Sequence, residues 1–160
     1  MIVQLRIDER LIHGQIVTSW SKTLNVNMIV VANDSAADNE LQKAMLKMAA
    51  PEGIKVNIRK VDDCIRLLKD EKADQFRILL IVDNPQDALR LVNELPISDV
   101  NVANFTKKKA ESKHQITTFI SASNEDLELF RQLVLTGKNV YSQMLPSTEA
   151  KSFKDLIERL

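Results

Sequence analysis

The amino-acid sequence predicts an α/β fold: a three-layer α/β/α domain around a mainly parallel sheet with helices on both faces. Two observations support this prediction. Strand-like apolar runs alternate along the chain with segments of helical periodicity, and several runs, such as Ile78–Val82, are apolar throughout. Such runs are expected where helices cover both faces of a sheet, and alternating elements imply parallel strands joined by crossovers. We expect one domain over residues 1–160, a length that suffices for a sizeable core.

The strands are expected, in chain order, at residues 2–7, 26–32, 54–59, 76–82, 100–103, 117–121 and 140–144. Between them, apolar side chains recur three and four positions apart and predict amphipathic helices. The sets are Ile16, Trp20 and Leu24; Leu41, Ala44, Met45 and Met48; Val61, Cys64 and Leu68; Ala88, Leu91, Val92 and Leu95; Leu127, Phe130 and Val134; and Phe153, Leu156, Ile157 and Leu160. We interpret these faces, with their methionines and Cys64, as core.

Short local signals mark several helix ends. Asn84 precedes Pro85 in the order of a cap and a first helical residue. Ser123 and Asp126 have the spacing of a capping box, and Gly137 is placed to end the helix that follows. The polar, lysine-rich stretch 104–115 interrupts the alternation, and we interpret it as a mobile loop.

Composition excludes several classes of protein. Lys+Arg and Asp+Glu both number 22, so the charge balance gives no sign of a nucleic-acid partner, and the lysines at 107–109 with Lys113 are interpreted as a solvated loop. No apolar stretch approaches the roughly 20 residues that span a bilayer, and no signal peptide is recognised. The single cysteine allows no internal disulfide and no thiolate metal site. We therefore expect a cytoplasmic protein without a metal or other cofactor.

The segment 6–15, Arg-Ile-Asp-Glu-Arg-Leu-Ile-His-Gly-Gln, is the strongest functional signal. It places two arginines, an aspartate and one of only two histidines in the turn from the first strand to the first helix. An imidazole can act as a nucleophile, guanidinium groups bind phosphoryl oxygens, and the amides at a helix start attract anions. The combination indicates a histidine that accepts and passes on a phosphoryl group, although a histidine before a helix is more often a capping or packing residue.

Roles within this segment follow from spacing. His13 is the expected nucleophile, and Arg10, in the same turn, is expected to bind the phosphoryl oxygens. Arg6 and Asp8 leave the same face of the strand, and a carboxylate suits orienting an arginine or the imidazole better than touching phosphate. The backbone near Leu11, Ile12, Gly14 and Gln15 is expected to donate amides to the anion, with Gly14 allowing close approach.

Other strand ends supply candidates for the rim of the site, because the carboxyl ends of parallel strands line the ligand crevice. Asn33 and Asp34 follow one expected strand, Asp83 and Asn84 follow another, and Asn104 follows a third. Asp or Asn before a helix is most often a cap, so this remains the competing interpretation.

Segment 6–15 resembles the active-site segment of the IIB proteins of the mannose–fructose–sorbose family of the bacterial sugar phosphotransferase system. Segments 28–34, 48–53, 81–85 and 100–102 recur in the family's order and spacing, so the resemblance covers essentially the whole chain. It implies the three-layer fold with the first strand central. It also implies that His13 takes a phosphoryl group from a IIA partner, in the family on Nδ1, and gives it to a sugar crossing through IIC and IID, with Arg6 and Arg10 flanking the phosphate.

The chain departs from the family pattern at two places. Ala103 and Asn104 stand where the family usually has Gly-Gly after Asn-Val, which suggests a reshaped loop near the phosphate. Gln143 stands where some relatives have an arginine. Both changes leave transfer through His13 possible and put the sugar class and partner fit in question.

Three other functions compete with this interpretation. A nucleotide-binding domain would need a glycine-rich phosphate loop, and a Ser or Cys hydrolase of the α/β type would need a G-x-S-x-G elbow, and neither pattern occurs. A IIB-like regulatory module, phosphorylated at His13 without donating to sugar, is the remaining alternative, and only the Ala103–Asn104 change favours it.

Overall fold

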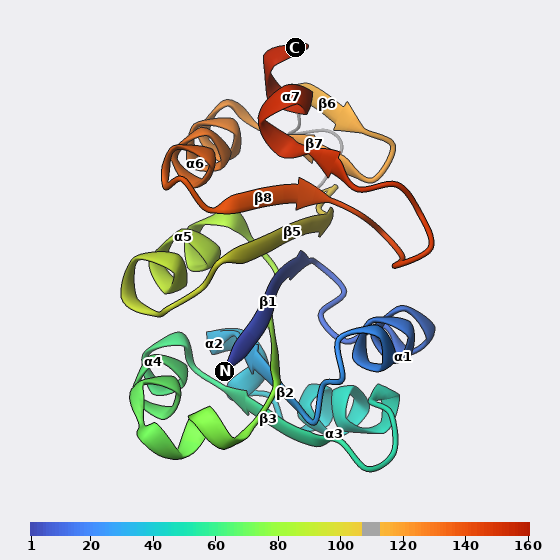
Figure 1. Cartoon of the computed structure of the whole chain (residues 1–160), viewed down its shortest axis with the longest axis vertical. Helices are drawn as coiled ribbons and strands as arrows, with labels where there is room; N and C mark the ends of the chain where they lie inside the picture. Colours follow the sequence, from blue (N-terminus) through green and yellow to red (C-terminus); the bar gives the residue numbers. More distant parts are fainter. Residues whose placement is uncertain (107–112) are drawn as a thin grey trace.

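The computed structural model describes residues 1–106 and 113–160. Its large sheet is made of β1 (Ile2–Asp8), β2 (Met28–Ala32), β3 (Lys55–Arg59), β4 (Ile78–Val82), β5 (Asp99–Asn104), β8 (Asn139–Ser142) and β9 (Lys151–Ser152). Their order is β3-β2-β4-β1-β5-β8-β9, with β1 at the centre (Figure 1). All neighbours pair in parallel except β8 and β9. The mainly parallel sheet and the central first strand are confirmed.

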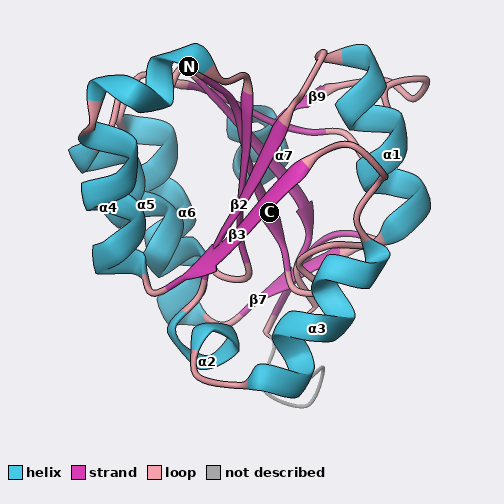
Figure 2. Cartoon of the chain, turned by 90° about the horizontal axis from the view of Figure 1, so that it is seen from below, coloured by secondary structure: helices cyan, strands magenta, loops and turns pink. Residues whose placement is uncertain are grey.

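Helices cover both faces of this sheet, as Figure 2 shows with α4, α5 and α6 on one side and α1 and α3 on the other. The helices are α1 (Gly14–Thr23), α2 (Asp34–Ala37), α3 (Glu40–Ala49), α4 (Val61–Lys69), α5 (Pro85–Glu94), α6 (Asn124–Leu135) and α7 (Phe153–Glu158), with a 3-10 helix η1 (Glu71–Gln75). This arrangement confirms the three-layer prediction.

The central strands are buried because both of their faces meet a helical layer. Every residue of β2 and β4 is buried, as the continuously apolar runs predict. Leu80 belongs to the core under α4, α5 and α6, whereas Ile81 belongs to the core under α1 and α3. Burying one such side chain stabilises the fold by about 1.5–3 kcal/mol. Strands that are apolar on both faces are therefore most stable at the centre of the sheet, between the two cores.

The expected helix ends are confirmed by their hydrogen bonds. The Asn84 side chain accepts from the Asp87 amide at 2.8 Å, and Pro85 opens α5. Ser123 and Asp126 form the capping box of α6, with the Asp126 amide 3.1 Å from the Ser123 hydroxyl. Gly137 follows α6 with φ of +79°, a left-handed conformation that glycine adopts without strain.

The expected strand at 117–121 is wrong. These residues belong to an antiparallel hairpin of β6 (His114–Thr117) and β7 (Ile120–Ala122), outside the large sheet. The reason is a tight turn, in which the Phe119 amide donates to the Thr117 hydroxyl at 3.1 Å. The expected loop at 104–115 falls largely on 107–112, outside the described residues, as do the lysines at 107–109. At its edges, Asn104 and His114 are strand residues.

The expected core face of α3 is also wrong. Leu41, Met45 and Met48 are 72%, 61% and 86% exposed, and the buried residue of this helix is Leu46. Apolar residues lie on more than one side of α3, so periodicity alone does not identify the side that meets the sheet.

The face of α1 is turned slightly from the expected one. Trp20 is buried as predicted, but its buried neighbours are Val17 and Ser21, whereas Ile16 and Leu24 are only half-buried. The predicted four-residue spacing therefore marks the edge of the contact face.

Cys64 lies in α4 and is fully buried, and burial raises the pKa of its thiol from 9.0 to about 12. A rise of this size lowers the thiolate fraction at pH 8 by roughly a thousandfold, and the thiolate is the reactive form. We expect Cys64 to react with a disulfide reagent far more slowly in the native protein than in 6 M guanidinium, measured by thiol-release absorbance. Equal rates under the two conditions would contradict the core assignment.

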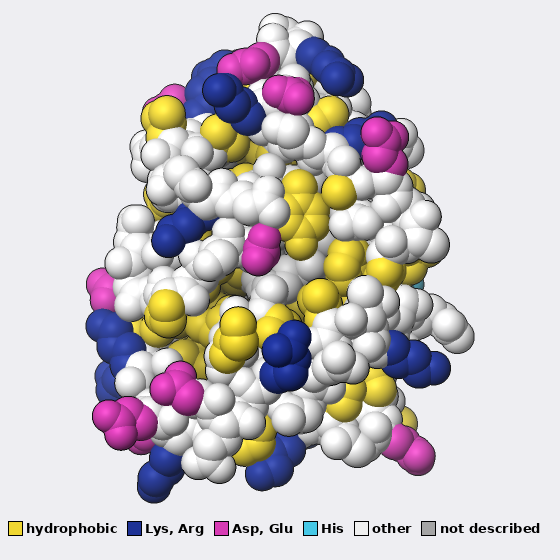
Figure 3. All heavy atoms as spheres, in the orientation of Figure 1, with side chains coloured by type: hydrophobic (Ala, Val, Ile, Leu, Met, Phe, Trp, Pro, Cys, Tyr) yellow, Lys and Arg dark blue, Asp and Glu magenta, His cyan; other side chains and the backbone are white. Residues whose placement is uncertain are grey.

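No helix in the described parts of the chain is long and apolar enough to cross a membrane. On the face shown in Figure 3, Lys and Arg side chains alternate with Asp and Glu side chains around the periphery, and apolar atoms show mainly nearer the middle. The even mixture agrees with the balanced charge of the sequence.

Candidate functional site

The turn from β1 to α1 is shaped by a backbone bend at Leu11. Leu11 has φ of +61°, and its amide donates to the Asp8 carbonyl at 2.9 Å. A left-handed conformation is strained for a residue with a branched side chain and persists where the surroundings enforce it. The Leu11 and Ile12 side chains are buried in the core under α1 and α3, which supplies that constraint. The Leu11 amide already donates to Asp8, so Leu11 shapes the turn through its left-handed backbone and its buried side chain.

Asp8 holds both arginines of the turn. Its Oδ2 atom lies 3.2 Å from Arg6 Nη2 and 3.1 Å from Arg10 Nη2, and its Oδ1 atom accepts from Arg10 Nε at 3.1 Å and from the Arg10 amide at 3.0 Å. Asp8 and Arg6 are wholly buried, whereas the Arg10 side chain is 34% exposed. The carboxylate thus fixes one guanidinium inside the protein and one at its surface, and the two are held next to each other.

Arg6 keeps unused donors in a dry place. Burial lowers the pKa of its guanidinium, and the Asp8 carboxylate opposes that effect. Its Nε and Nη1 atoms are buried, and no acceptor among the described residues reaches them. Buried donors normally have partners, so these point to a place for an anion or for water.

Polar side chains continue from Arg6 along this face of the sheet. Gln4 donates to the Tyr141 hydroxyl at 2.7 Å, and burial raises the pKa of that hydroxyl. Asn101, which pairs with Arg6 in the β1–β5 ladder, donates its side-chain amide to the Gln143 carbonyl at 2.8 Å and accepts from the Gln143 amide at 3.0 Å. Where β1, β5 and β8 form it, this face of the sheet is therefore polar, whereas the opposite face, under α4, α5 and α6, is apolar.

His13 is exposed and occupies the cap position of α1, without a side-chain capping bond. Gly14, Gln15 and Ile16 form the first turn, whose amides have no intrahelical acceptor. The helix dipole and these amides favour an anion beside His13.

Gly14 is not demanded by the fold. A Cβ atom at this position would lie 3.5 Å from the Ala49 carbonyl oxygen, an ordinary contact, and its φ is not in the left-handed region. Neither packing nor backbone conformation therefore requires a glycine at this position. Gln15, next along α1, is exposed.

Three of the rim candidates, Asn33, Asp34 and Asn84, accept hydrogen bonds from amides at helix starts. Asn33 accepts from the Ala36 amide at 2.8 Å at the start of α2, and Asp34 accepts from the Val61 amide at 2.9 Å at the start of α4. Asn84 caps α5 and also donates to Asp83 at 2.7 Å. Within the described residues, these bonds account for the side chains locally and favour the capping interpretation.

Ala103 and Asn104, expected in a loop, form the end of β5. The ladder shifts register there, from Ile7 opposite Val102 to Asp8 opposite Asn104, so Ala103 is the extra residue of a bulge. The Glu9 amide donates to the Asn104 carbonyl at 2.9 Å, which ties the turn to this bulge.

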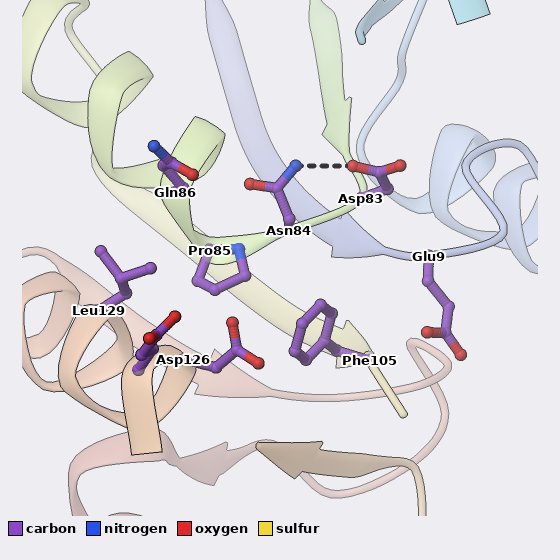
Figure 4. Close-up of a pocket in the computed structure, with 9 residues that line it drawn as sticks. Glu9, Asp83, Asn84, Pro85, Gln86, Phe105, Asp126 and Leu129 are labelled. Atoms are coloured by element: carbon purple, nitrogen blue, oxygen red, sulfur yellow. Dashed lines mark hydrogen bonds between the residues drawn. The ribbon is translucent and has the colours of Figure 1, made fainter. Parts of the chain in front are cut away.

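A pocket of about 440 Å³ opens at the carboxyl edge between the starts of α5 and α6. Its lining residues are Glu9, Asp83, Asn84, Pro85, Gln86, Phe105, Glu125, Asp126 and Leu129. In Figure 4, Asp83 and Asn84 lie on one side of the pocket, and Phe105 and Asp126 on the other. Burial also raises the pKa of neighbouring Asp87. Carboxylates repel anions, so this pocket is less suited to a phosphoryl group than the arginine pair is.

Sequence reasoning missed one element of the site, the segment after β8. Met144 Sδ lies 3.9 Å from Arg6 Nη2 and 3.8 Å from Arg10 Nη2, and the Met144 carbonyl accepts from the Trp20 indole at 2.9 Å. No local pattern marks a methionine as a neighbour of arginines more than 130 positions away. The only signal was indirect: Gln4, Arg6 and Asp8 alternate on one face of an apolar strand, which indicates a polar cover over that face.

Comparison with known proteins identifies the family. The family model of the PTS system sorbose subfamily IIB component matches residues 2–160. A probable phosphotransferase enzyme IIB component of Streptococcus pyogenes serotype M6 is 41% identical, over 98% of this chain and 99% of its own length. The mannose-specific EIIAB component of Escherichia coli K12 is 32% identical, over all of this chain, and the chain spans 50% of its length.

The fold agrees with that assignment. The crystal structure of the IIBSor domain of the sorbose permease from Klebsiella pneumoniae superposes with a TM-score of 0.92 at 29% identity, covering 99% of this chain and 97% of that one. Residues 2–160, which the family model matches, include the β1–α1 turn with His13 and both arginines. The chain therefore belongs to the sorbose subfamily of IIB components of the sugar phosphotransferase system, and its role is that of a phosphotransfer subunit.

Proposed function

We propose that residues 1–160 act as one IIB domain in which His13 accepts a phosphoryl group from a phosphohistidine of a IIA component. His13 then transfers the group to a sugar held by the IIC and IID membrane components, as a protein-Nπ-phosphohistidine–sugar phosphotransferase. The observation that carries the proposal is the exposed His13 imidazole at the start of α1. It follows, in the same turn, two arginines that are both held by the buried Asp8 carboxylate.

The chemistry needs positioning and charge neutralisation more than covalent machinery. A neutral imidazole nitrogen of His13 attacks the phosphorus in line, and the nitrogen–phosphorus bond of the donor histidine breaks as the new bond forms. In the second step, a sugar hydroxyl oxygen attacks the phosphorus, the His13 nitrogen leaves, and the hydroxyl proton passes to solvent. The first-turn amides of α1 and the Arg10 guanidinium stabilise the charge on the equatorial oxygens.

Exposure of His13 suits a carrier with two successive partners. Both the IIA donor and the sugar acceptor must reach the same nitrogen in line, which a buried imidazole would prevent. The protein acts in the cytoplasm, peripheral to the transporter, and its membrane contact is made through IIC and IID. No nucleic acid takes part, in keeping with the balanced charge.

The direct test follows one phosphoryl group through both steps. Incubation with radiolabelled phospho-IIA should label the chain in an acid-labile, alkali-stable form, and membranes containing IIC and IID should then release the label as sugar phosphate. Label that forms but never reaches any of the tested sugars (mannose, fructose, sorbose and N-acetylgalactosamine) would favour the regulatory alternative. The only feature that favours that alternative is the Ala103–Asn104 pair, which lies at the end of β5.

Arg10→Lys should impair transfer although the charge is kept. A lysine is a point charge, and it cannot reproduce a planar guanidinium that contacts Asp8 through two nitrogens while facing the phosphoryl oxygens. Loss of one charge-assisted hydrogen bond costs about 1.5–3 kcal/mol, or roughly ten- to a hundredfold in rate. Single-turnover transfer from phospho-IIA measures it.

Arg90→Lys is the matched control for this variant. Arg90 pairs with Asp62 on the exposed faces of α5 and α4, so the same change there should leave the transfer rate unaltered. Equal rates for wild type and Arg10→Lys would rule out a guanidinium-specific role.

A further inference from the structure

We propose that the Met144 side chain occupies the place between Arg6 and Arg10 where phosphoryl oxygens bind, and that it swings out when the phosphoryl group arrives. This inference rests on the proposed function and adds a residue to it. Met144 is then a positioning residue that covers the anion site while His13 is unphosphorylated.

Two cationic groups converge on one neutral sulfur atom. Met144 Sδ lies 3.9 Å from Arg6 Nη2 and 3.8 Å from Arg10 Nη2. The same two nitrogens share Asp8 Oδ2, at 3.2 and 3.1 Å. The carboxylate oxygen and the sulfur are thus common neighbours of both guanidinium groups. The carboxylate oxygen is a strong hydrogen-bond acceptor, whereas the thioether sulfur is a weak one.

The charges at this point favour replacement of the sulfur by an anion. Two guanidinium groups and one carboxylate leave one positive charge in excess within this trio. A thioether is only a weak acceptor. An anionic oxygen in the same place would make charge-assisted bonds of about 2.7–2.9 Å. The Nε and Nη1 atoms of Arg6 have no partner among residues 1–106 and 113–160, so this buried guanidinium has further donors to offer.

The backbone around Met144 is fixed, so the side chain is the part that moves. The Trp20 indole donates to the Met144 carbonyl at 2.9 Å, and Asn101 makes two bonds to the backbone of Gln143. The Gln143 side chain donates to the Thr148 carbonyl at 2.7 Å, which closes the segment on itself. An unbranched side chain with three rotatable bonds can leave without disturbing these contacts.

A neutral cover has a use in a carrier. Arg6 has no exposed surface, so the Met144 side chain helps to keep water from the Arg6 guanidinium when no phosphoryl group is present. Interactions with an arriving anion are stronger in a dry site than in water. A charged cover would bind the arginines too well to leave, whereas a thioether yields to a phosphoryl oxygen.

The first test follows the five methionine methyl groups by carbon-13 NMR, with the Met144 signal assigned from Met144→Leu. On phosphorylation of His13, the Met144 methyl signal should shift and narrow, whereas those of buried Met28 and exposed Met45 should stay in place. Inorganic phosphate alone should shift the same signal, and Arg10→Ala should abolish that response. A Met144 signal that moves no more than that of Met28 in both experiments would overturn the proposal.

The second test compares two substitutions by titration with inorganic phosphate. Met144→Ala removes the cover and should tighten phosphate binding by about two- to tenfold, the range for loss of one weak competing contact. Met144→Leu keeps an apolar cover with less freedom to turn away, and its binding should be no tighter than that of the wild type. Unchanged or weaker binding in Met144→Ala would overturn the proposal. This titration needs no transfer, so a failure to label His13 would count against the proposed function alone.

Discussion

His13→Ala is expected to abolish acceptance of the phosphoryl group completely while leaving the fold intact. The imidazole is exposed and makes no side-chain capping bond to α1, so its loss should change the free energy of unfolding by no more than about 0.5 kcal/mol. Nothing else in the turn can act as a nitrogen nucleophile, because guanidinium groups stay protonated. Labelling with phospho-IIA, together with urea denaturation, measures both quantities.

His114→Ala is the matched control, since His114 is the other histidine of the chain. It lies in β6, where its Nε2 atom is 2.7 Å from Asn124 Oδ1 at the start of α6, and it does not share a turn with Arg6 and Arg10 as His13 does. Full labelling of His114→Ala and none of His13→Ala is the expected pair of results. Label that survives in His13→Ala would show that another residue carries the phosphoryl group.

Asp8→Asn is expected to cost both stability and transfer. The change removes the carboxylate that balances Arg6, which is wholly buried and hydrogen-bonds to Asp8. Breaking a buried ion pair from one side typically destabilises a protein by about 3–5 kcal/mol, because the other charge is left uncompensated. Arg10 also loses its bidentate partner, so single-turnover transfer should fall in whatever fraction remains folded. Urea denaturation and transfer at low temperature measure the two effects.

Asp62→Asn provides the same chemical change on the surface. The side chains of Asp62 and Arg90 are 62% and 50% exposed, and exposed pairs contribute only about 0–1 kcal/mol. The control should therefore keep nearly its full stability and its full transfer rate. If the two variants lost equal stability, Asp8 would not be the clamp described above.

The layers of the fold were well predicted because a strand that is buried on both faces is apolar at every position, and such a pattern is visible in the local sequence. The continuously apolar run Ile78–Val82 is an example. The same holds for the caps at Asn84 and Ser123, where the partners lie three residues apart. The faces of α1 and α3 were less well predicted, because the side of a helix that is buried depends on the angle at which it meets the sheet.

The candidate site divides in the same way. Alternation along β1 placed Arg6 and Asp8 on one face, and the structure brings them together. Met144 escaped prediction because it reaches the arginines from the far end of the chain, and no spacing rule links residues that distant in sequence. Contacts between residues that are distant in the chain produce no periodic pattern in the sequence.

The central place of β1 has a consequence for how the protein is made. Arg6 pairs with Ile81 of β4 on one side and with Asn101 of β5 on the other, so its strand has no neighbour in the sheet until those segments leave the ribosome. Closing loops of this length is slow compared with forming helices. The turn that carries His13 is thus synthesised before the strands that flank β1, and β1 gains both of its neighbours only after they emerge. A nascent chain halted before β5 would expose β1 as an open edge, ready to pair with another chain.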